Sequence, residues 1–185
     1  MELHLFDFDG TLFHSPGPPD SWGGFWWDDP QSLHPPCVPL KPGPQWWNSE
    51  VVSKAKQSIS DPNIWTFLCT GRALNSFSRY RIPELLEGHG LFFDELYLKE
   101  GASTEQFKIK VLAHLLRKYP FVSKVQIWED RHDHLNSFCS FVENQGIECV
   151  GHAITRKEPQ CDPTSKVSSP LHKRVALRYL KRQGF

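Results

Sequence analysis

Short apolar runs alternate with longer segments of helical periodicity along this chain. Five runs have the length of a strand and are rich in β-branched or aromatic residues: the run that begins at Leu3, and residues 63–70, 93–99, 124–130 and 147–154. Two of the intervening segments repeat apolar side chains on one helical stripe, first Phe107, Val111, Leu112, Leu115 and Tyr119, and then Leu135, Phe138, Cys139 and Val142. A repeated strand-then-helix order predicts an α/β fold, in which a parallel sheet has helices on both faces.

Residues 14–50 interrupt this alternation. They hold nine of the fifteen prolines and five of the seven tryptophans. Proline at that density prevents regular helices and central strands, whereas so many tryptophans are far too apolar for a disordered tether. The segment is therefore predicted to be an ordered insert after the first strand, folded over another part of the protein near the active site.

The composition is that of one ordinary globular domain, residues 1–185, with equal numbers of basic and acidic residues. No run reaches the roughly 18 apolar residues of a membrane span. The first predicted strand begins as early as Leu3, so the N-terminal residues do not show the pattern of a signal peptide. We therefore expect an intracellular protein of the cytoplasm or nucleus. The charge is uneven, however, because residues 156–182 carry eight Lys or Arg against two acids. This basic C-terminal segment, residues 155–185, is a candidate contact for a polyanion, and a solvated helix face is the alternative.

Two aspartates stand at the end of the first apolar run, in the sequence LHLFDFDGTLF. A buried carboxylate has to be paired, hydrogen-bonded or bound to a metal. Asp7 and Asp9 are two residues apart, so their side chains share a face of an extended strand. Both carboxylates can therefore reach one ligand.

Polar side chains also follow two of the other predicted strands. The second run ends in Thr70, Gly71 and Arg72, and the fourth ends in Glu129 and Asp130. Because ligands of a doubly wound sheet bind beyond the carboxyl ends of its strands, these groups are expected to meet the two aspartates at one edge. Carboxylates from separate strands suit Mg²⁺ together with a substrate phosphate. A Thr hydroxyl, backbone N–H groups and a Lys suit the phosphate oxygens.

The motifs DFDGT, LCTGR and WEDRHD resemble, in order and in placement, the first, second and fourth motifs of the haloacid-dehalogenase-like (HAD) phosphohydrolase superfamily. The resemblance implies that Asp7 is a nucleophile that forms an aspartyl-phosphate, and that Asp9 is the general acid and base. It also implies that Thr70 contacts the phosphoryl group. Mg²⁺ would be held by Asp7, Asp130 and the backbone carbonyl of Asp9, and the substrate would be bound by Thr11, Gly71 and Arg72.

The third HAD motif is a catalytic lysine, for which the sequence offers two candidates. Lys108 starts the amphipathic segment that leads into the fourth strand, where HAD proteins place this lysine, and Lys99 ends the third strand. A cation at a helix start opposes the helix dipole, which favours a functional reason for Lys108. For the acids Glu129 and Asp133, the sequence allows a role at the site. It equally allows one of them to support a neighbouring ligand and the other to cap a helix.

A closer resemblance rests on the insert GGFWW…WWN after DFDGTLF, together with LYLK…STEQFK and WEDR, which look like the HAD domain of Swiss Army Knife RNA repair proteins. It implies a Mg²⁺-dependent phosphomonoester hydrolase that acts on phosphorylated RNA or DNA ends. Bases would stack on the paired tryptophans of the insert, which are Trp26, Trp27, Trp46 and Trp47. The alternative is that these side chains pack the core of the insert. Two other functions stay open, a phosphatase of small metabolites or nucleotides and a noncatalytic RNA-binding module. The sequence indicates no membrane and no particular protein partner.

Overall fold

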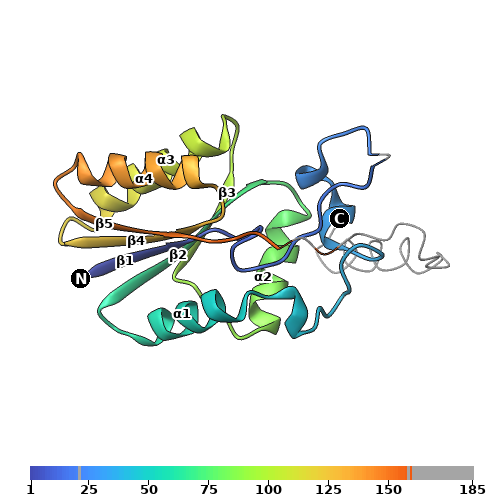
Figure 1. Cartoon of the computed structure of the whole chain (residues 1–185). Coiled ribbons are helices and arrows are strands. Elements are labelled where there is room, and N and C mark those ends of the chain that lie inside the picture. Colours follow the sequence, from blue (N-terminus) through green and yellow to red (C-terminus); the bar gives the residue numbers. More distant parts are fainter. Residues whose placement is uncertain (21, 158, 160–185) are drawn as a thin grey trace, which may run out of the picture.

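The computed structural model of the chain contains a sheet of five parallel strands in the order β3-β2-β1-β4-β5 (Figure 1). The strands are β1 (Glu2–Phe6), β2 (Ile64–Ala73), β3 (Glu95–Lys99), β4 (Lys124–Glu129) and β5 (Glu148–Ala153). Each of them falls on one of the predicted strand runs. The structure describes residues 1–20, 22–157 and 159, so the basic segment predicted at residues 155–185 lies, from residue 160 on, outside the described residues.

Helices cover both faces of this sheet. They are α1 (Ser49–Ser60), α2 (Ser78–Gly88), α3 (Thr104–Lys118) and α4 (His132–Glu143). Helices α3 and α4 lie on one face, and α1 and α2 lie on the other (Figure 1). The predicted α/β fold is therefore confirmed. In the described part of the chain, no helix has the length and apolar character needed to cross a membrane.

The central strand β1 is buried on both of its faces. Leu5 belongs to the core beneath α3 and α4, whereas Phe6 belongs to the core shared by α1, α2 and the insert. Leu5 is in register with Phe67 of β2 and with Ile127 of β4. Burial on both faces is what a parallel sheet requires, and it continues through Asp7, which is also buried.

Helix α3 starts at a capping serine. Ser103 Oγ accepts a hydrogen bond from the N–H of Gln106 at 3.2 Å, which satisfies one of the N–H groups that a helix start leaves unpaired. Most of the predicted apolar stripe is buried against the sheet, namely Phe107, Val111, Leu112 and Leu115. Lys108, the fifth residue of the helix, is buried with this stripe, so the helix carries a cation into the protein near its N-terminal end.

The insert is built from turns rather than from long elements. It contains three short 3-10 turns, η1 (Trp26–Asp28), η2 (Pro30–Leu33) and η3 (Pro44–Trp46). The buried Arg81 of α2 donates hydrogen bonds to the carbonyl oxygens of Leu33, Pro39 and Leu40 at 2.8 to 3.1 Å. These bonds satisfy carbonyl groups for which a proline-rich segment has few backbone N–H partners.

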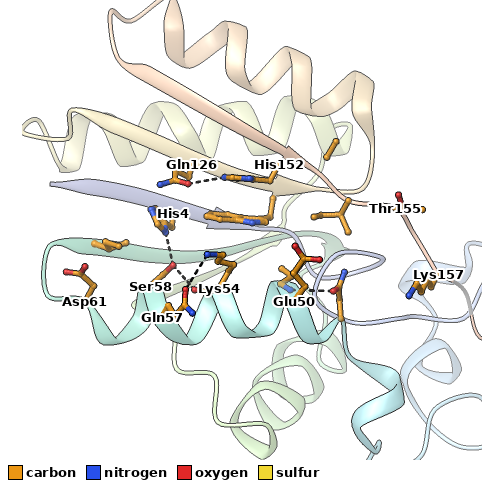
Figure 2. A pocket seen from close by; sticks show the side chains of 16 residues that line it. His4, Glu50, Lys54, Gln57, Ser58, Asp61, Gln126, His152, Thr155 and Lys157 are labelled. Atoms are coloured by element: carbon orange, nitrogen blue, oxygen red, sulfur yellow. Dashed lines mark hydrogen bonds between the residues drawn. The ribbon is translucent and has the colours of Figure 1, made fainter.

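A groove of about 810 Å³ lies between α1 and the adjoining face of β4 and β5 (Figure 2). Its lining includes His4, Ser58, Gln126 and His152, which are joined in two hydrogen-bonded pairs, His4 with Ser58 at 2.7 Å and His152 with Gln126 at 2.9 Å. Asp7 and Asp9 do not line this groove. The groove is therefore separate from the edge at which the predicted active-site residues lie.

Candidate active site

The first strand delivers Asp7 to a buried group of charges. Its backbone N–H donates to the carbonyl of Trp128 at 3.0 Å, which ties the end of β1 to the end of β4. Lys108 Nζ lies 2.6 Å from Asp7 Oδ1 and 2.7 Å from Glu129 Oε2, and all three side chains are almost fully buried. Of the two candidate lysines, Lys108 is the one that contacts Asp7, whereas Lys99 ends β3.

Burial and ion pairing act in opposite directions on the pKa values of this group. Burial raises the pKa of Asp7 to about 8, against the opposing effect of the Lys108 charge. Burial also disfavours ionised Glu129, but the charge of Lys108 and hydrogen bonds outweigh it and lower the pKa of Glu129 to about 2. Although burial lowers the pKa of Lys108, Asp7 and Glu129 raise it above its ordinary value. Lys108 is thus a fixed cation between two carboxylates of unequal proton affinity.

Asp130 completes a group of carboxylates that fits a metal ion. Asp7, Glu129 and Asp130 each offer one oxygen such that all three lie within 4.8 Å of one another. Burial, together with the hydrogen bond and the charge of Glu129, raises the pKa of Asp130 to about 6. Clustered carboxylate oxygens fit a hard divalent cation such as Mg²⁺, whose charge would relieve their mutual repulsion. The tertiary structure therefore brings two predicted metal ligands, Asp7 and Asp130, together with Glu129.

Asp9 is paired separately, with Arg72. Arg72 Nε and Nη2 lie 2.9 and 2.8 Å from Asp9 Oδ1, and Nε lies 3.0 Å from Oδ2. Ser15 Oγ donates to Oδ1, and Thr70 Oγ1 donates to Oδ2 at 3.4 Å. These contacts fix the orientation of the Asp9 carboxylate. All of these contacts use the side-chain oxygens of Asp9. The predicted metal contact uses the backbone carbonyl of Asp9, so it stays a prediction.

Arg72 also joins the site to the insert. Its Nη1 donates to the carbonyl of Trp27 at 3.0 Å and to Ser32 Oγ at 2.6 Å. The guanidinium carbon lies 5.5 Å from the centre of the Trp27 ring, a distance typical of a cation–π contact. Arg72, predicted to bind substrate, is 2% exposed and binds Asp9 and the insert in this structure.

Two glycines let chain segments approach the site closely. Gly10 has a φ of 79°, and an added Cβ there would lie 2.4 Å from Asp130 Oδ2. An added Cβ at Gly71 would lie 2.7 Å from the side chain of Thr104, the first residue of α3. Gly10 therefore allows the β1 turn to touch the carboxylate group, and Gly71 allows the end of β2 to touch α3. Thr11, in the turn after β1, is fully buried, and its hydroxyl donates a hydrogen bond to Asp7 Oδ2 at 3.4 Å.

The four tryptophans predicted to stack on bases differ in their surroundings. Trp26 and Trp47 are buried, the first with its Nε1 donating to a backbone carbonyl of the insert at 2.7 Å and the second within the core. Trp46 packs against the same core. Trp27 is half-buried and lies beside Arg72. Of the four, Trp27 is the one that contacts the guanidinium bound to Asp9.

Three residues at this edge were missed by sequence reasoning. Ser15 and Ser32 reach it from the insert, as described, and Arg156 reaches it from the segment after β5, with Nη1 3.0 Å from Asp130 Oδ2. No local motif marks any of them, because their positions depend on how distant segments fold back over the sheet. Asp133, whose role was left open, is exposed in the first turn of α4 and lies outside the carboxylate group.

Comparison with known families matches residues 17–163 to the family described as HAD domain family 1 in Swiss Army Knife RNA repair proteins. The matched residues include most of the insert, Thr70, Lys108 and Asp130. The uncharacterized protein YMR265C of Saccharomyces cerevisiae is 26% identical over 168 residues, which cover 76% of this chain and 36% of that protein. The chain therefore spans little more than a third of the length of this relative.

Solved structures share the fold at low sequence identity. One is a chain in the structure of the Pnkp1/Rnl/Hen1 RNA repair complex, with a TM-score of 0.51 and 17% identity, covering 82% of this chain and 43% of that chain. Another is the HAD domain of the effector protein Lem4 from Legionella pneumophila, with a TM-score of 0.53 and 13% identity, covering 98% of this chain and 92% of that chain. At such identities the likeness concerns the fold.

Proposed function

The chain belongs to HAD domain family 1 of the Swiss Army Knife RNA repair proteins, and from this we propose that it is a phosphomonoester hydrolase with Asp7 as its nucleophile. The observation that carries the proposal is the pair of carboxylates that follows β1, in which Asp7 binds Lys108 and Asp9 binds Arg72. Asp7 shares Lys108 with Glu129, whereas Asp9 is paired with Arg72, so the two carboxylates lie in different surroundings and can take different roles, one as the nucleophile and the other as the acid and base.

The proposed reaction has two halves. In the first, an oxygen of Asp7 attacks the phosphorus atom, the bond from phosphorus to the leaving oxygen breaks, and protonated Asp9 donates its proton to that oxygen. In the second, Asp9 accepts a proton from the water that attacks the aspartyl-phosphate, which releases phosphate and regenerates the Asp7 carboxylate. The contacts that Arg72 makes with Asp9 hold its carboxylate in one orientation for both transfers.

The remaining groups of the site are proposed to stabilise charge. A divalent cation, when bound, supplies electrostatic stabilisation of the transferring phosphoryl group. Its proposed ligands are Asp7, Asp130 and the backbone carbonyl of Asp9. Lys108, fixed 2.6 Å from Asp7, keeps the nucleophile oriented and favours its ionised form, and the Thr70 hydroxyl is proposed to bind a phosphate oxygen.

Phosphorylated RNA ends are the substrate that we propose. The family is named for RNA repair proteins. Trp27 lies beside Arg72 at the edge of the site, and we propose that a base of the substrate stacks on this side chain. The eight cations against two acids in residues 156–182 suit the phosphates of a polynucleotide backbone. In the rival function, a phosphatase of small metabolites or nucleotides, the insert acts as a lid that excludes water.

A panel of substrates tests the proposal. The rates of phosphate release from an aryl phosphate, a mononucleotide, a 3′-phosphorylated RNA and its 5′-phosphorylated isomer would be measured with Mg²⁺, from low to physiological salt. For RNA, we expect kcat/KM to fall steeply with salt, with a logarithmic slope of about 0.7 per neutralised phosphate. A mononucleotide that equals both RNAs at every salt concentration would favour the metabolite phosphatase. Binding of RNA without hydrolysis of any substrate would favour the noncatalytic module.

A further inference from the structure

We propose that the groove beside α1 binds a nucleotide of the RNA chain, whose base stacks on His152 while the phosphorylated end of the same chain lies at Asp7. The inference rests on the proposed function, because it concerns the part of the RNA that does not react. It assigns a ligand to a groove that none of the proposed catalytic residues line.

Three rings form a stack across the sheet on the side of α1. Phe6 of β1, Trp128 of β4 and His152 of β5 are neighbours in the strand register. The centre of the Trp128 ring lies 4.2 Å from that of Phe6 and 4.3 Å from that of His152, with interplanar angles of 9° and 10°. Phe6 and Trp128 are buried, whereas His152 is half-buried on the edge strand of the sheet. The stack therefore ends in a ring that is partly open to solvent.

Hydrogen bonds hold the His152 ring parallel to the Trp128 ring. His152 Nε2 donates to Gln126 Oε1 at 2.9 Å, and Gln126 Nε2 donates to Glu2 Oε2 at 2.8 Å. Within the part of the chain that the structure describes, Trp128 is the only ring against which His152 lies. Bases stack on histidine rings as they do on other aromatic side chains. A base can therefore continue the stack on a ring whose orientation is already fixed.

The groove also offers cations for backbone phosphates. Lys54 of α1 and Lys157 after β5 line it, and Figure 2 shows Lys54 on the opposite side of the groove from His152 and Lys157 at one end. Glu50 and Asp61 line it as well, so two lysines are balanced by two acids. Charge alone therefore does not hold a polyanion here, and stacking has to supply most of the affinity.

The groove runs along the whole of α1 from the edge of the active site. Its lining includes Asn48 and Asp61, which cap the two ends of this helix, and twelve helical residues span about 18 Å. Its volume of about 810 Å³ lies within the usual range for ligand pockets. Trp128 connects the two sites, because its ring lines the groove and its backbone carbonyl accepts the hydrogen bond from Asp7. One RNA chain can thus reach both.

Binding of a phosphorylated RNA tests the inference. A single-stranded RNA of about eight nucleotides, labelled with a fluorophore at the end opposite its phosphate, would be titrated with residues 1–185 in EDTA and followed by anisotropy. We expect His152→Ala to weaken binding about five- to a hundredfold, the range for loss of one stacked base. His152→Phe keeps a flat ring and should recover most of the affinity. Wild-type affinity in folded His152→Ala would overturn the inference.

Changes in the RNA identify the base that stacks. Each base in turn would be replaced by an abasic sugar, and the affinity of each RNA would be measured for the wild type and for His152→Ala. At one position, loss of the base should weaken binding to the wild type but should weaken binding to His152→Ala much less, because the two changes remove the same contact. Equal losses in the two proteins at every position would show that no base contacts His152.

A free mononucleotide tests whether the ligand is part of an RNA chain. Because the groove and the active site are proposed to hold one chain, the RNA should bind more tightly than the mononucleotide. A mononucleotide that binds the wild type as tightly as the RNA does, with an affinity that falls in His152→Ala, would overturn the assignment to RNA. The groove would then be a site for free nucleotides.

The salt dependence of binding tests the two lysines. Lys54→Gln and Lys157→Gln should each reduce the slope of log affinity against log salt by about 0.7, the value for one phosphate contact on a single strand. Lys56→Gln is the matched control, because it removes the same charge from the same helix, and Lys56 lines a separate pocket with Trp47 and His89. Equal reductions in all three variants would contradict phosphate contacts in the groove.

Melting temperatures separate binding from packing. If the stack only stabilised β5, His152→Ala would lower the melting temperature and leave the RNA affinity of the folded protein unchanged, which would overturn the inference. Failure of the two proposals can also be told apart. RNA binding that depends on His152, without hydrolysis of any phosphomonoester, contradicts the proposed function alone. Hydrolysis of RNA ends with an affinity independent of His152 contradicts this inference alone.

Discussion

Lys108 Nζ lies 2.6 Å from Asp7 Oδ1, although 101 residues separate the two along the chain. The contact distinguishes the two lysines that the sequence left as candidates. We expect Lys108→Met to lower the rate of aryl phosphate hydrolysis by about a hundredfold or more, as loss of an electrostatic contact at a reacting group does. Lys99→Met is the matched control and should keep most of the rate. Equal small losses in the two variants would contradict a role for Lys108.

Loss of Lys108 should also destabilise the protein, because Asp7 and Glu129 would lose their shared cation. Removing one partner of a buried ion pair costs about 3 to 5 kcal/mol. The melting temperature of Lys108→Met would therefore be measured beside the rate. The rate would be determined only at temperatures at which the variant is folded, so that unfolding is not counted as a catalytic defect.

Replacement of Asp7 by Asn should abolish turnover and keep the fold. The amide is nearly isosteric with the carboxylate but is not a nucleophile, so the loss should reach several orders of magnitude. Asp133→Asn is the matched control, because Asp133 is exposed on α4 and lies outside the carboxylate group. A tenfold loss of rate corresponds to an increase of only about 1.4 kcal/mol in the activation free energy. If Asp7→Asn kept more than a tenth of the wild-type activity, Asp7 would be excluded as the nucleophile.

The raised pKa of Asp7 predicts how stability depends on pH in the presence of EDTA. Burial raises this pKa from 3.8 to about 8, so the contribution of Asp7 to stability is fully present below 3.8 and is lost as the pH rises through 8. The free energy of unfolding of the wild type should therefore fall across this window relative to that of Asp7→Asn, which has no such titration. Urea unfolding of both proteins at several pH values measures the difference, and parallel profiles would contradict the prediction.

Mg²⁺ should stabilise the folded protein. A ligand that binds only the folded state adds about 2.7 kcal/mol at a hundred times its dissociation constant. We expect the melting temperature at neutral pH to rise with Mg²⁺ in the wild type and in Asp133→Asn. The rise should be much smaller in Asp130→Asn, which lacks one oxygen ligand of the candidate metal group. An equal rise in all three proteins would place the bound Mg²⁺ elsewhere.

Two buried arginines hold the insert, and they should differ in their effect on the reaction. Arg72 contacts Asp9 as well as the insert, whereas Arg81 contacts backbone carbonyls of the insert and Glu84. Arg72→Lys cannot reproduce the paired contacts to Asp9, so we expect it to lower kcat by at least tenfold as well as the melting temperature. Arg81→Lys should lower the melting temperature while kcat stays within a few-fold of the wild type. A normal kcat in Arg72→Lys would show that the orientation of Asp9 does not depend on this pair.

The amino-acid sequence by itself determined the α/β fold and the edge at which polar residues gather. Strand and helix periods are local properties of the sequence. Because the carboxyl ends of parallel strands share one edge of the sheet, Asp7, Thr70 and Asp130 could be predicted to lie together from the sequence alone. The stripe of α3 was likewise visible, because burial of one helix face repeats with the helical period.

Only the tertiary structure decided which charges pair within that edge. Lys108 reaches Asp7 because α3 packs across the sheet, and Asp9 binds Arg72 because the insert folds back and supplies Ser32 to the same guanidinium. The tryptophans also differ in their burial, because Trp47 lies in the core and Trp27 lies at the edge of the site. Such contacts join residues that are distant in the chain, and their partners are set by packing, which no local period or motif encodes.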